Sequence, residues 1–494
     1  MLTYDELTCP ERELWDAFAE GRQVDLRPGG GGGEDVGRGD EWGPERTVRA
    51  EALTTLLLGR GSGLSGGVAA LRLAGARITG ALAWEGAEIR HLLHLDGCRL
   101  EQRVRLDSAS TLAVAVVRSW LPGFSAPSAR IGGRLDLRGS VIEGQGRNAV
   151  ELIHAHVAGG LRLDGAVVSA PDGVAVSAGG IVMDGAVICE DGFRSRGAVM
   201  FPGARLSGGL FMGGARLEAP GGVALGADNA QVSAIRCNQG FTADGGVHMR
   251  GAQISDLLSF EEAVLGGSPR SLVATGLRVQ DLDLRCATPP AGSLDLRGVR
   301  ATWVQDDPRS WAPEIQLEGF AYDSIWSEPD TVGGRLEWIR RNPGYSPQPY
   351  EQLAGHYRRI GHDDEARRTL LAKQRHRRRL LPPWSRFWGY LLDATVGYGY
   401  RPWLAGAWLA VLTLLGALVF GTHTPSPDKP GEGPPFNAVV YTLDLLIPIG
   451  GFGQRDAWHW TDGALQAATY ALIAIGWTLT TAVVAGVTRA LSKN

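Results

Sequence analysis

The chain has 494 residues, enough for two or three domains, and its formal net charge of −4 gives no basis for bulk electrostatic binding to nucleic acid. Its five cysteines lie far apart and form no CxxC pair, which argues against a disulfide framework and against a cysteine-rich zinc module. The 70 glycines are well above the usual share, yet they do not follow a collagen period.

Residues 1–67 are predicted to form a helical cap that precedes a run of repeats. The stretches "CPERELWDAFAEG" and "ERTVRAEALTTLLLG" have helical spacing, and the glycine-rich loop "RPGGGGGEDVGRGDEW" separates them. The N-terminus is acidic and has no apolar core. We therefore expect no signal peptide and a reducing, cytoplasmic setting for the N-terminal part.

One phrase recurs through the middle of the chain: aliphatic-x-aliphatic-x-Gly-small-x-aliphatic. The copies that begin at Leu71, Leu82 and Leu93 follow one another at intervals of eleven residues. Later copies begin at Leu135, Leu161, Ile181, Val199, Leu210, Val247 and Leu294, and degenerate copies begin at Leu258 and Leu282. Such a phrase resembles that of pentapeptide-repeat proteins, with longer and less regular coils.

The phrase has a physical meaning. Alternation at period two places its first and third residues on one strand face, the glycine permits a sharp turn, and the small residue fits inside the corner. Stacked units then share a continuous aliphatic core, which a single unit cannot form. We predict a mainly β fold, a right-handed parallel β-solenoid over residues 68–305, with these residues in its core: Leu71, Leu82, Leu93, Leu135, Leu161, Ile181 and Leu210. The alternative is a β-sandwich, which does not require one phrase at every strand.

Residues 306–347 are predicted to lead out of the solenoid, and residues 348–402 to form a basic helical neck. An anionic leaflet attracts a cluster of basic residues, and tryptophans favour headgroup depth. We expect seven residues of the neck at a membrane surface: Lys373, Arg375, Arg377, Arg378, Arg379, Trp384 and Trp388. The alternative is a solvated helix end.

Residues 403–494 are predicted to form a membrane domain with spans at 403–420 and 465–487. Both runs are uncharged and approach or reach the length that a bilayer requires. Because basic residues flank spans on the cytoplasmic side, we expect a two-span plasma-membrane protein with its solenoid and both termini in the cytoplasm.

Two segments resemble parts of ion channels. Thr395 to Gly399 spells TVGYG, the potassium selectivity filter, but it precedes the first span, so we expect an interfacial turn. Residues 436–453 lie between the spans and end in Gly451, Phe452 and Gly453, which resembles a pore helix with its filter. An oligomeric channel is therefore one alternative function, and an amphipathic segment that dips into the outer leaflet is the other interpretation.

Other chemistry is weakly indicated. The GxGxxG match at Gly61 to Gly66 follows a helical stretch and precedes the first repeat, which favours an entry loop over a dinucleotide site. His154 and His156 are expected on one strand face, and they supply two corners of a metal site at most. We expect no catalytic residues, no cofactor and no metal.

Four stretches, "VDLR", "LRLAGARITG", "TVGYGYRPWLA" and "YTLDLLIPI", resemble one actinobacterial group of proteins that carries the name membrane-associated oxidoreductase. The similarity covers essentially the whole chain, and it implies a membrane location and, by its name, a redox activity. The residues themselves contain no cofactor motif. We therefore predict a membrane-anchored cytoplasmic scaffold, with the oxidoreductase as an alternative.

The predicted partners are an anionic lipid membrane and an unknown protein on the solenoid surface, without nucleic acid. Small residues four apart in the spans also suggest a homo-oligomer, because they let helices approach closely. These pairs are Gly406 and Ala410, Ala467 and Ala471, and Ala482 and Gly486.

Overall fold

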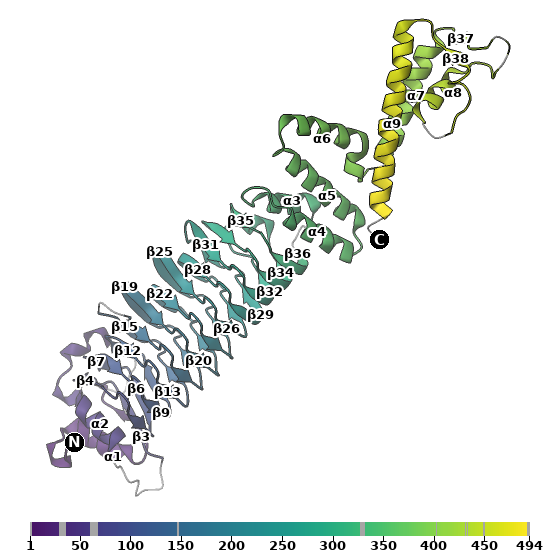
Figure 1. Ribbon diagram of the computed structural model, residues 1–494. Coiled ribbons are helices and arrows are strands. Elements are labelled where there is room, and N and C mark those ends of the chain that lie inside the picture. Colours follow the sequence, from purple (N-terminus) through teal and green to yellow (C-terminus); the bar gives the residue numbers. More distant parts are fainter. Residues whose placement is uncertain are drawn as a thin grey trace. The chain divides into compact units, whose positions relative to one another are not determined.

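The computed structural model describes residues 2–28, 36–59, 68–145, 148–326, 331–401, 403–429, 431, 433–447 and 450–491. The chain divides into two compact units, Met1–Gln352 and Leu353–Asn494. The first unit is a mainly β parallel β-solenoid of about 11 turns, whose strands stack one above another (Figure 1).

Each coil of the solenoid contributes strands to two parallel sheets. Along one side of the first sheet lie β1 (Val24–Asp25), β3 (Ala70–Ala74), β6 (Leu92–Asp96), β10 (Val114–Val117), β14 (Leu135–Asp136), β18 (Leu161–Arg162), β21 (Val187–Ile188), β24 (Leu210–Phe211), β27 (Ile235–Arg236), β29 (Gln253–Ser259), β32 (Arg278–Asp283), β34 (Arg300–Gln305) and β36 (Ala321–Trp326). The same sheet contains β5 (Glu88–Ile89), β9 (Ser110–Thr111), β13 (Arg130–Ile131), β17 (His156–Val157), β20 (Val182–Met183), β23 (Arg205–Leu206) and β26 (Gln231–Val232).

The second sheet covers the opposite part of each coil. Its main path contains β2 (Thr47–Arg49), β4 (Arg77–Thr79), β7 (Arg99–Leu100), β11 (Trp120–Leu121), β15 (Val141–Glu143), β19 (Val167–Ser177), β22 (Arg194–Met200), β25 (Arg216–Gly226), β28 (Thr242–His248), β31 (Arg270–Val273), β33 (Ser293–Asp295) and β35 (Ile315–Gln316). Four short strands pair beside this path: β8 (Val104–Arg105), β12 (Phe124–Ser125), β16 (Val150–Glu151) and β30 (Val264–Leu265).

The predicted core residues are buried. All seven are at most 1% exposed: Leu71, Leu82, Leu93, Leu135, Leu161, Ile181 and Leu210. Leu71 pairs with Leu93, so one coil takes 22 residues there, whereas Leu135 pairs with Leu161 at an interval of 26. The phrase therefore marks the inward-facing positions of the solenoid correctly.

One copy of the phrase is out of register. The copy at Ile181 was expected to turn at Gly185, but the left-handed corner residue is Gly180, with φ 62°. Val182 pairs with Arg205, so β20 lies in the column of β17 and β23. Because glycines stand at both 180 and 185, the sequence alone does not show which of them forms the corner, and the strand pairing with neighbouring coils decides it.

The corners follow the predicted chemistry. The corner residue Gly97 has φ 58°, and Arg118 takes the same left-handed conformation one coil later, with φ 48°. The small residue that follows each corner is buried, as Cys98 and Ser119 illustrate. The Ser119 hydroxyl accepts the backbone N–H of Cys98 at 3.0 Å and donates to the carbonyl oxygen of Val117 at 2.8 Å. The Ser119 hydroxyl thus satisfies one backbone N–H and one backbone carbonyl oxygen inside the corner.

The strand ladder extends beyond the predicted bounds 68–305. At the N-terminal end, β1 pairs with β3 and β2 pairs with β4. At the other end β35 and β36 continue the two sheets through the segment 306–347, which was expected to be a linker. Between β35 and β36 the phrase is degenerate: Gly319 keeps the left-handed corner, with φ 75°, but Phe320 and Tyr322 replace the small residue and the last aliphatic residue.

Helices cover the N-terminal end, as predicted. The elements are η1 (Tyr4–Glu6), α1 (Cys9–Phe18), η3 (Val36–Glu41), η4 (Pro44–Arg46) and α2 (Ala50–Leu58), and α1 and α2 contact β3. Buried Glu11 accepts from the Arg49 guanidinium at 2.6 Å and from the backbone N–H of Thr8 at 2.9 Å. Burial opposes ionisation of Glu11, but these hydrogen bonds prevail and lower its pKa to about 2.

Side chains close the C-terminal end, where α3 (Val332–Arg340) and the start of α4 (Gln348–Arg359) follow the last strand, while η5 (Pro308–Ser310) lies between β34 and β35. The Asn342 amide oxygen accepts the N–H of Leu317 at 2.8 Å, and the Gln348 amide donates to the carbonyl oxygen of Phe320 at 2.8 Å. Gln348 was expected in the neck, but its amide takes the place of a further strand here and gives a hydrogen-bond partner to a backbone carbonyl at the edge of the sheet.

The second unit is helical. It contains α5 (Asp363–Arg378), α6 (Pro383–Val396), η6 (Gly397–Gly399), α7 (Trp403–Gly421), α8 (Ala438–Leu446), α9 (Gly463–Leu491) and a short hairpin of β37 (Ser426–Pro427) and β38 (Trp458–His459). Helix α7 is long and apolar enough to cross a membrane, by length and composition. Among the helices of the described residues it alone meets that test, so the second predicted span, which lies within α9, is not established.

Helix α8 packs against both α7 and α9 (Figure 1). A Cβ atom at Gly416 of α7 would lie 2.3 Å from the Thr442 side chain, and one at Gly476 of α9 would lie 2.3 Å from the Leu446 carbonyl oxygen. By contrast, nothing lies within 4 Å of such an atom at Gly406, one of the predicted small contact residues. The close contacts therefore use other glycines than expected, and the Ala482 and Gly486 side chains lie outside the described residues.

Candidate functional site

A charged motif, Asp-x-Arg, recurs on the outer surface of the solenoid. In each copy the backbone N–H of the arginine and its guanidinium donate to the aspartate two residues earlier, with the terminal nitrogen at 2.6–2.8 Å from the carboxylate. The pairs are Asp25 with Arg27, Asp136 with Arg138, Asp283 with Arg285, Asp295 with Arg297, and Asp307 with Arg309.

These pairs fix the charge state of their carboxylates. Burial of Asp136 and Asp295 disfavours ionisation, but the hydrogen bonds from their arginines outweigh it and lower both pKa values. The same contacts raise the pKa of the partners Arg138 and Arg297. The surface therefore presents fixed charges in a repeating pattern near neutral pH.

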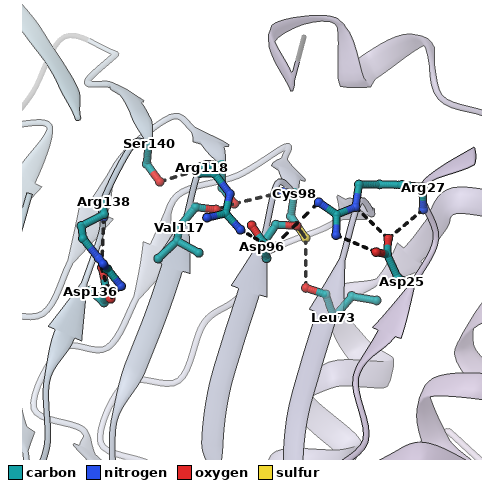
Figure 2. Close-up of polar contacts among 11 residues, drawn as sticks. Asp25, Arg27, Leu73, Asp96, Cys98, Val117, Arg118, Asp136, Arg138 and Ser140 are labelled. Atoms are coloured by element: carbon teal, nitrogen blue, oxygen red, sulfur yellow. Dashed lines mark hydrogen bonds and ion pairs between the residues drawn. The ribbon is translucent and has the colours of Figure 1, made fainter. Parts of the chain in front are cut away.

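The charges also connect neighbouring coils (Figure 2). Asp96 lies between Arg118, which donates to it, and Arg27, whose nearest guanidinium nitrogen is 3.9 Å away. Because Arg27 also pairs with Asp25, these four residues form a chain of alternating charge that runs across the strands from coil to coil. Each link is partly exposed, so this chain orders the surface more than it stabilises the fold.

Two grooves lie on the outer side of the first sheet. The first groove has a volume of about 580 Å³ and is floored by the small side chains of Ala115 and Val117. His94, Arg118, Asp136 and further charged residues form its rim. The imidazole of His94 is half-buried, and burial lowers its pKa, so it is neutral near pH 7.

The second groove, nearer the C-terminal end, has a volume of about 350 Å³. Its lining combines an exposed tryptophan, Trp303, with charged and amide side chains. Both grooves follow one strand column, so a long ligand could contact several coils at once.

The predicted membrane-surface residues divide into two groups. Arg375 and Arg378 do not form a free basic collar, because both pair with Asp393 of α6, at 2.9 and 3.0 Å. Arg378 also lies 3.9 Å from the ring centroid of Tyr390. Arg377 and Arg379 are exposed, and Lys373 is half-buried. The ion pairs that make Arg375 and Arg378 unavailable to lipid join two helices, so the sequence could not reveal them.

The exposed part of α6 is aromatic. Trp384 is 81% exposed and stacks on Phe387, which is also exposed. The predicted Trp388 has its side chain outside the described residues. Exposed Leu380 precedes the helix, so an apolar surface lies beside Arg377 and Arg379 in the chain.

The TVGYG segment ends a helix. Thr395 and Val396 are the last residues of α6, and Gly397 follows in the left-handed conformation, with its N–H bonded to the carbonyl oxygens of Asp393 and Leu392. Tyr398 is also left-handed, with φ 54°. Helices commonly end in this way, so the segment forms the expected turn, and its place at a membrane interface stays a prediction.

The loop with Gly451, Phe452 and Gly453 is organised by a buried carboxylate. Asp444, in the last turn of α8, accepts the backbone N–H of Phe452 at 2.8 Å, and those of Gln454 and Arg455 at 2.9 and 2.8 Å. Potassium filters instead turn carbonyl oxygens toward a shared axis. Residues 448 and 449, part of the predicted segment 436–453, lie outside the described residues.

The other chemical candidates are now placed. His154 does not share a strand face with His156, because it occupies a left-handed corner, with φ 56°, before β17. In the described part of the chain no three His, Cys, Asp or Glu side chains form a metal-binding group. Four cysteines are buried, and burial raises the thiol pKa of Cys98 and Cys286 to about 12. Such thiols are poor nucleophiles. The stretch 61–66 lies outside the described residues.

Sequence reasoning predicted a protein partner on the solenoid surface, but it missed the charged motif and the two grooves there. The stretch "LDLR" stands at Leu135, Leu282 and Leu294, and its recurrence was the available signal for the charged motif. The grooves had no such signal, since each is lined by residues from several coils. Comparison of the chain with known protein families, with curated proteins and with solved structures finds no match.

Proposed function

We propose that the protein is a membrane-anchored scaffold whose solenoid binds a protein partner through the outer side of its first sheet. The observation that carries this proposal is the combination of an apolar helix, α7, with a solenoid of about 11 coils whose outer surface carries five Asp-x-Arg pairs and two grooves. Extended solenoid surfaces suit binding along their length, because each coil repeats the same presentation.

The membrane anchor is supported by the surface of the second unit. On α7, Leu414 is 72% exposed and Leu418 is 69% exposed. Contiguous apolar surfaces of this kind mark contact with lipid or with another protein. Helix α9 contacts α7 and α8, and its apolar residues Tyr470 and Trp477 are also exposed. We propose that α7 and α9 both span the plasma membrane, with the right-handed solenoid and both termini in the cytoplasm.

The neck is proposed to contact an anionic leaflet. Arg377 and Arg379 supply exposed positive charge, and Trp384 and Phe387 supply exposed rings beside it. Each basic side chain near such a surface contributes about 1 kcal/mol. Because Arg375 and Arg378 are paired with Asp393, we expect them to position α6 rather than to bind lipid.

We also propose that the chain is a member of the actinobacterial group named membrane-associated oxidoreductase, but we do not propose the redox activity that this name implies. The buried thiols disfavour thiol chemistry, and the loop around Phe452 directs backbone N–H groups to Asp444. Neither observation favours the redox enzyme or the channel over the scaffold.

Cross-linking in native membranes tests the proposal. The affinity-tagged full chain would be cross-linked, captured and analysed by mass spectrometry, alongside two variants. Arg278→Glu changes an exposed arginine of β32 on the first sheet, outside the lining of the second groove, and Arg194→Glu is the matched control, an exposed arginine on the second sheet. We expect a defined protein to be captured by the wild type and the control, and to be lost with Arg278→Glu. Equal capture by all three chains would contradict binding through the first sheet.

A further inference from the structure

One carboxylate in the second groove is left unpaired by its neighbours. Asp281 lies on β32, where it pairs in register with Leu257 on one side and with Trp303 on the other. Within the described residues its Oδ1 is buried and accepts no hydrogen bond. A buried polar atom without a partner costs about 1–3 kcal/mol, and a cation beside the carboxylate would offset part of that cost.

The remaining charges of the groove are engaged. Its lining holds two arginines and three acids: Arg236, Arg285, Glu261, Asp281 and Asp283. Arg285 pairs with Asp283 at 2.7 Å and with Glu261 at 3.0 Å. The guanidinium of Arg236 lies 5.6 Å from the ring centroid of Phe211. The excess charge of the groove is therefore one negative charge, and Asp281 is the acid without an ion-pair partner.

An aromatic surface lies beside this carboxylate. Trp303 is 54% exposed, and Leu257 is half-buried on the opposite side of Asp281. Adjacent strands are about 4.8 Å apart, so the ring of Trp303 and the carboxylate are close neighbours. A cation over an indole gains about 0.5–2 kcal/mol. The groove thus favours a positive head group on an apolar stem.

We propose that the second groove binds the arginine or lysine side chain of a protein segment, with the head group on Asp281 and the stem against Trp303 and Leu257. This inference rests on the proposed scaffold function and names the chemistry of its partner. A divalent cation would require more oxygen ligands than Asp281 and its paired neighbours supply. An anion is disfavoured by the excess negative charge. The volume of about 350 Å³ lies at the low end for small-molecule sites and suits one side chain.

Peptide binding to the purified full chain in detergent tests the proposal. The probe is a fluorescent pentapeptide with a central arginine between leucines, and its analogue carries citrulline, which keeps the shape but not the charge. We expect the arginine peptide to bind at least about tenfold more tightly than the citrulline peptide, which corresponds to about 1.4 kcal/mol. Asp281→Asn should lose that preference, and Trp303→Ala should weaken binding severalfold. The matched control, Asp191→Asn, removes an exposed carboxylate from the first groove and should bind as the wild type does.

A second measurement separates binding from folding. Because Asp281 carries an unpaired buried oxygen, Asp281→Asn should leave the thermal midpoint unchanged or raise it. A lowered midpoint would show that Asp281 stabilises the fold, and this would overturn the proposal. Equal binding of the two peptides, or of wild type and Asp281→Asn, would also overturn it. Binding of free arginine amide as tight as that of the peptide would indicate a small-amine site instead.

The failure of this inference can be told from the failure of the scaffold function. If cross-linking captures a partner equally well with Asp281→Asn, the scaffold function holds and the side-chain site is wrong. If the arginine peptide binds as expected but no partner is captured in membranes, the site holds and the scaffold function is wrong.

Discussion

Leu161 offers the sharpest test of the solenoid core. It is fully buried and stacks between Leu135 and Val187 of the neighbouring coils. Leu161→Ala leaves a cavity that the rigid backbone ladder on both sides cannot close. Such a truncation costs about 2–5 kcal/mol. One kcal/mol shifts a thermal midpoint by about 2–4 °C in domains of 150–250 residues, and by less in a longer unit.

The assay is the thermal midpoint of the full chain, followed by circular dichroism at the strand signal. Leu161→Ala is expected to lower the midpoint by several degrees, and Leu161→Asp to abolish folding of the solenoid, because it buries an unpaired carboxylate. The control is Leu112→Ala, whose side chain is 54% exposed and whose loss costs less than about 0.5 kcal/mol. If the two alanine variants melt together, Leu161 does not belong to a packed column.

Two further predictions concern pH and helix packing. In the folded chain the pKa values of Glu11, Asp136 and Asp295 lie below their unfolded values of about 4, so their charged forms stabilise the fold above that pH and this contribution disappears as the pH falls further. The thermal midpoint should therefore decrease as the pH is lowered below about 4, and this decrease should be smaller in the double variant Asp136→Asn/Asp295→Asn. If the midpoints of wild type and double variant decrease in parallel, these two carboxylates are not the cause. Gly476→Ala places a Cβ atom against a backbone oxygen of α8 and should destabilise the second unit in detergent, whereas Gly406→Ala has free space and should not. Equal melting of these two glycine variants would contradict the packing of α8 against α9.

The repeat predicted much of the first unit, because stacked coils require the same phrase at each inward-facing position. The buried leucines at Leu71, Leu93 and Leu135 follow from it directly. The ends of the ladder could not be predicted in this way. β36 pairs through its backbone, and Gln348 closes the edge through its side chain, and neither interaction needs a recurring sequence.

The candidate sites were less predictable than the fold. The basic run around Arg378 was visible in the sequence, but its pairing with Asp393 depends on how α5 packs against α6. The unpaired oxygen of Asp281 likewise depends on residues from the coils before and after it. The sequence shows which side chains are charged, and the packing decides which of them remain available to a ligand.

Thiol labelling of intact cells tests the membrane-anchored arrangement most directly. Thr424, exposed between α7 and α8, would be replaced by cysteine, and native Cys9, exposed at the N-terminal end, serves as the internal reference. A membrane-impermeant reagent should label Thr424→Cys in intact cells, and Cys9 only after the cells are opened. Labelling of Cys9 in intact cells, or labelling of Thr424→Cys only after lysis, would contradict a solenoid held on the cytoplasmic face by membrane spans.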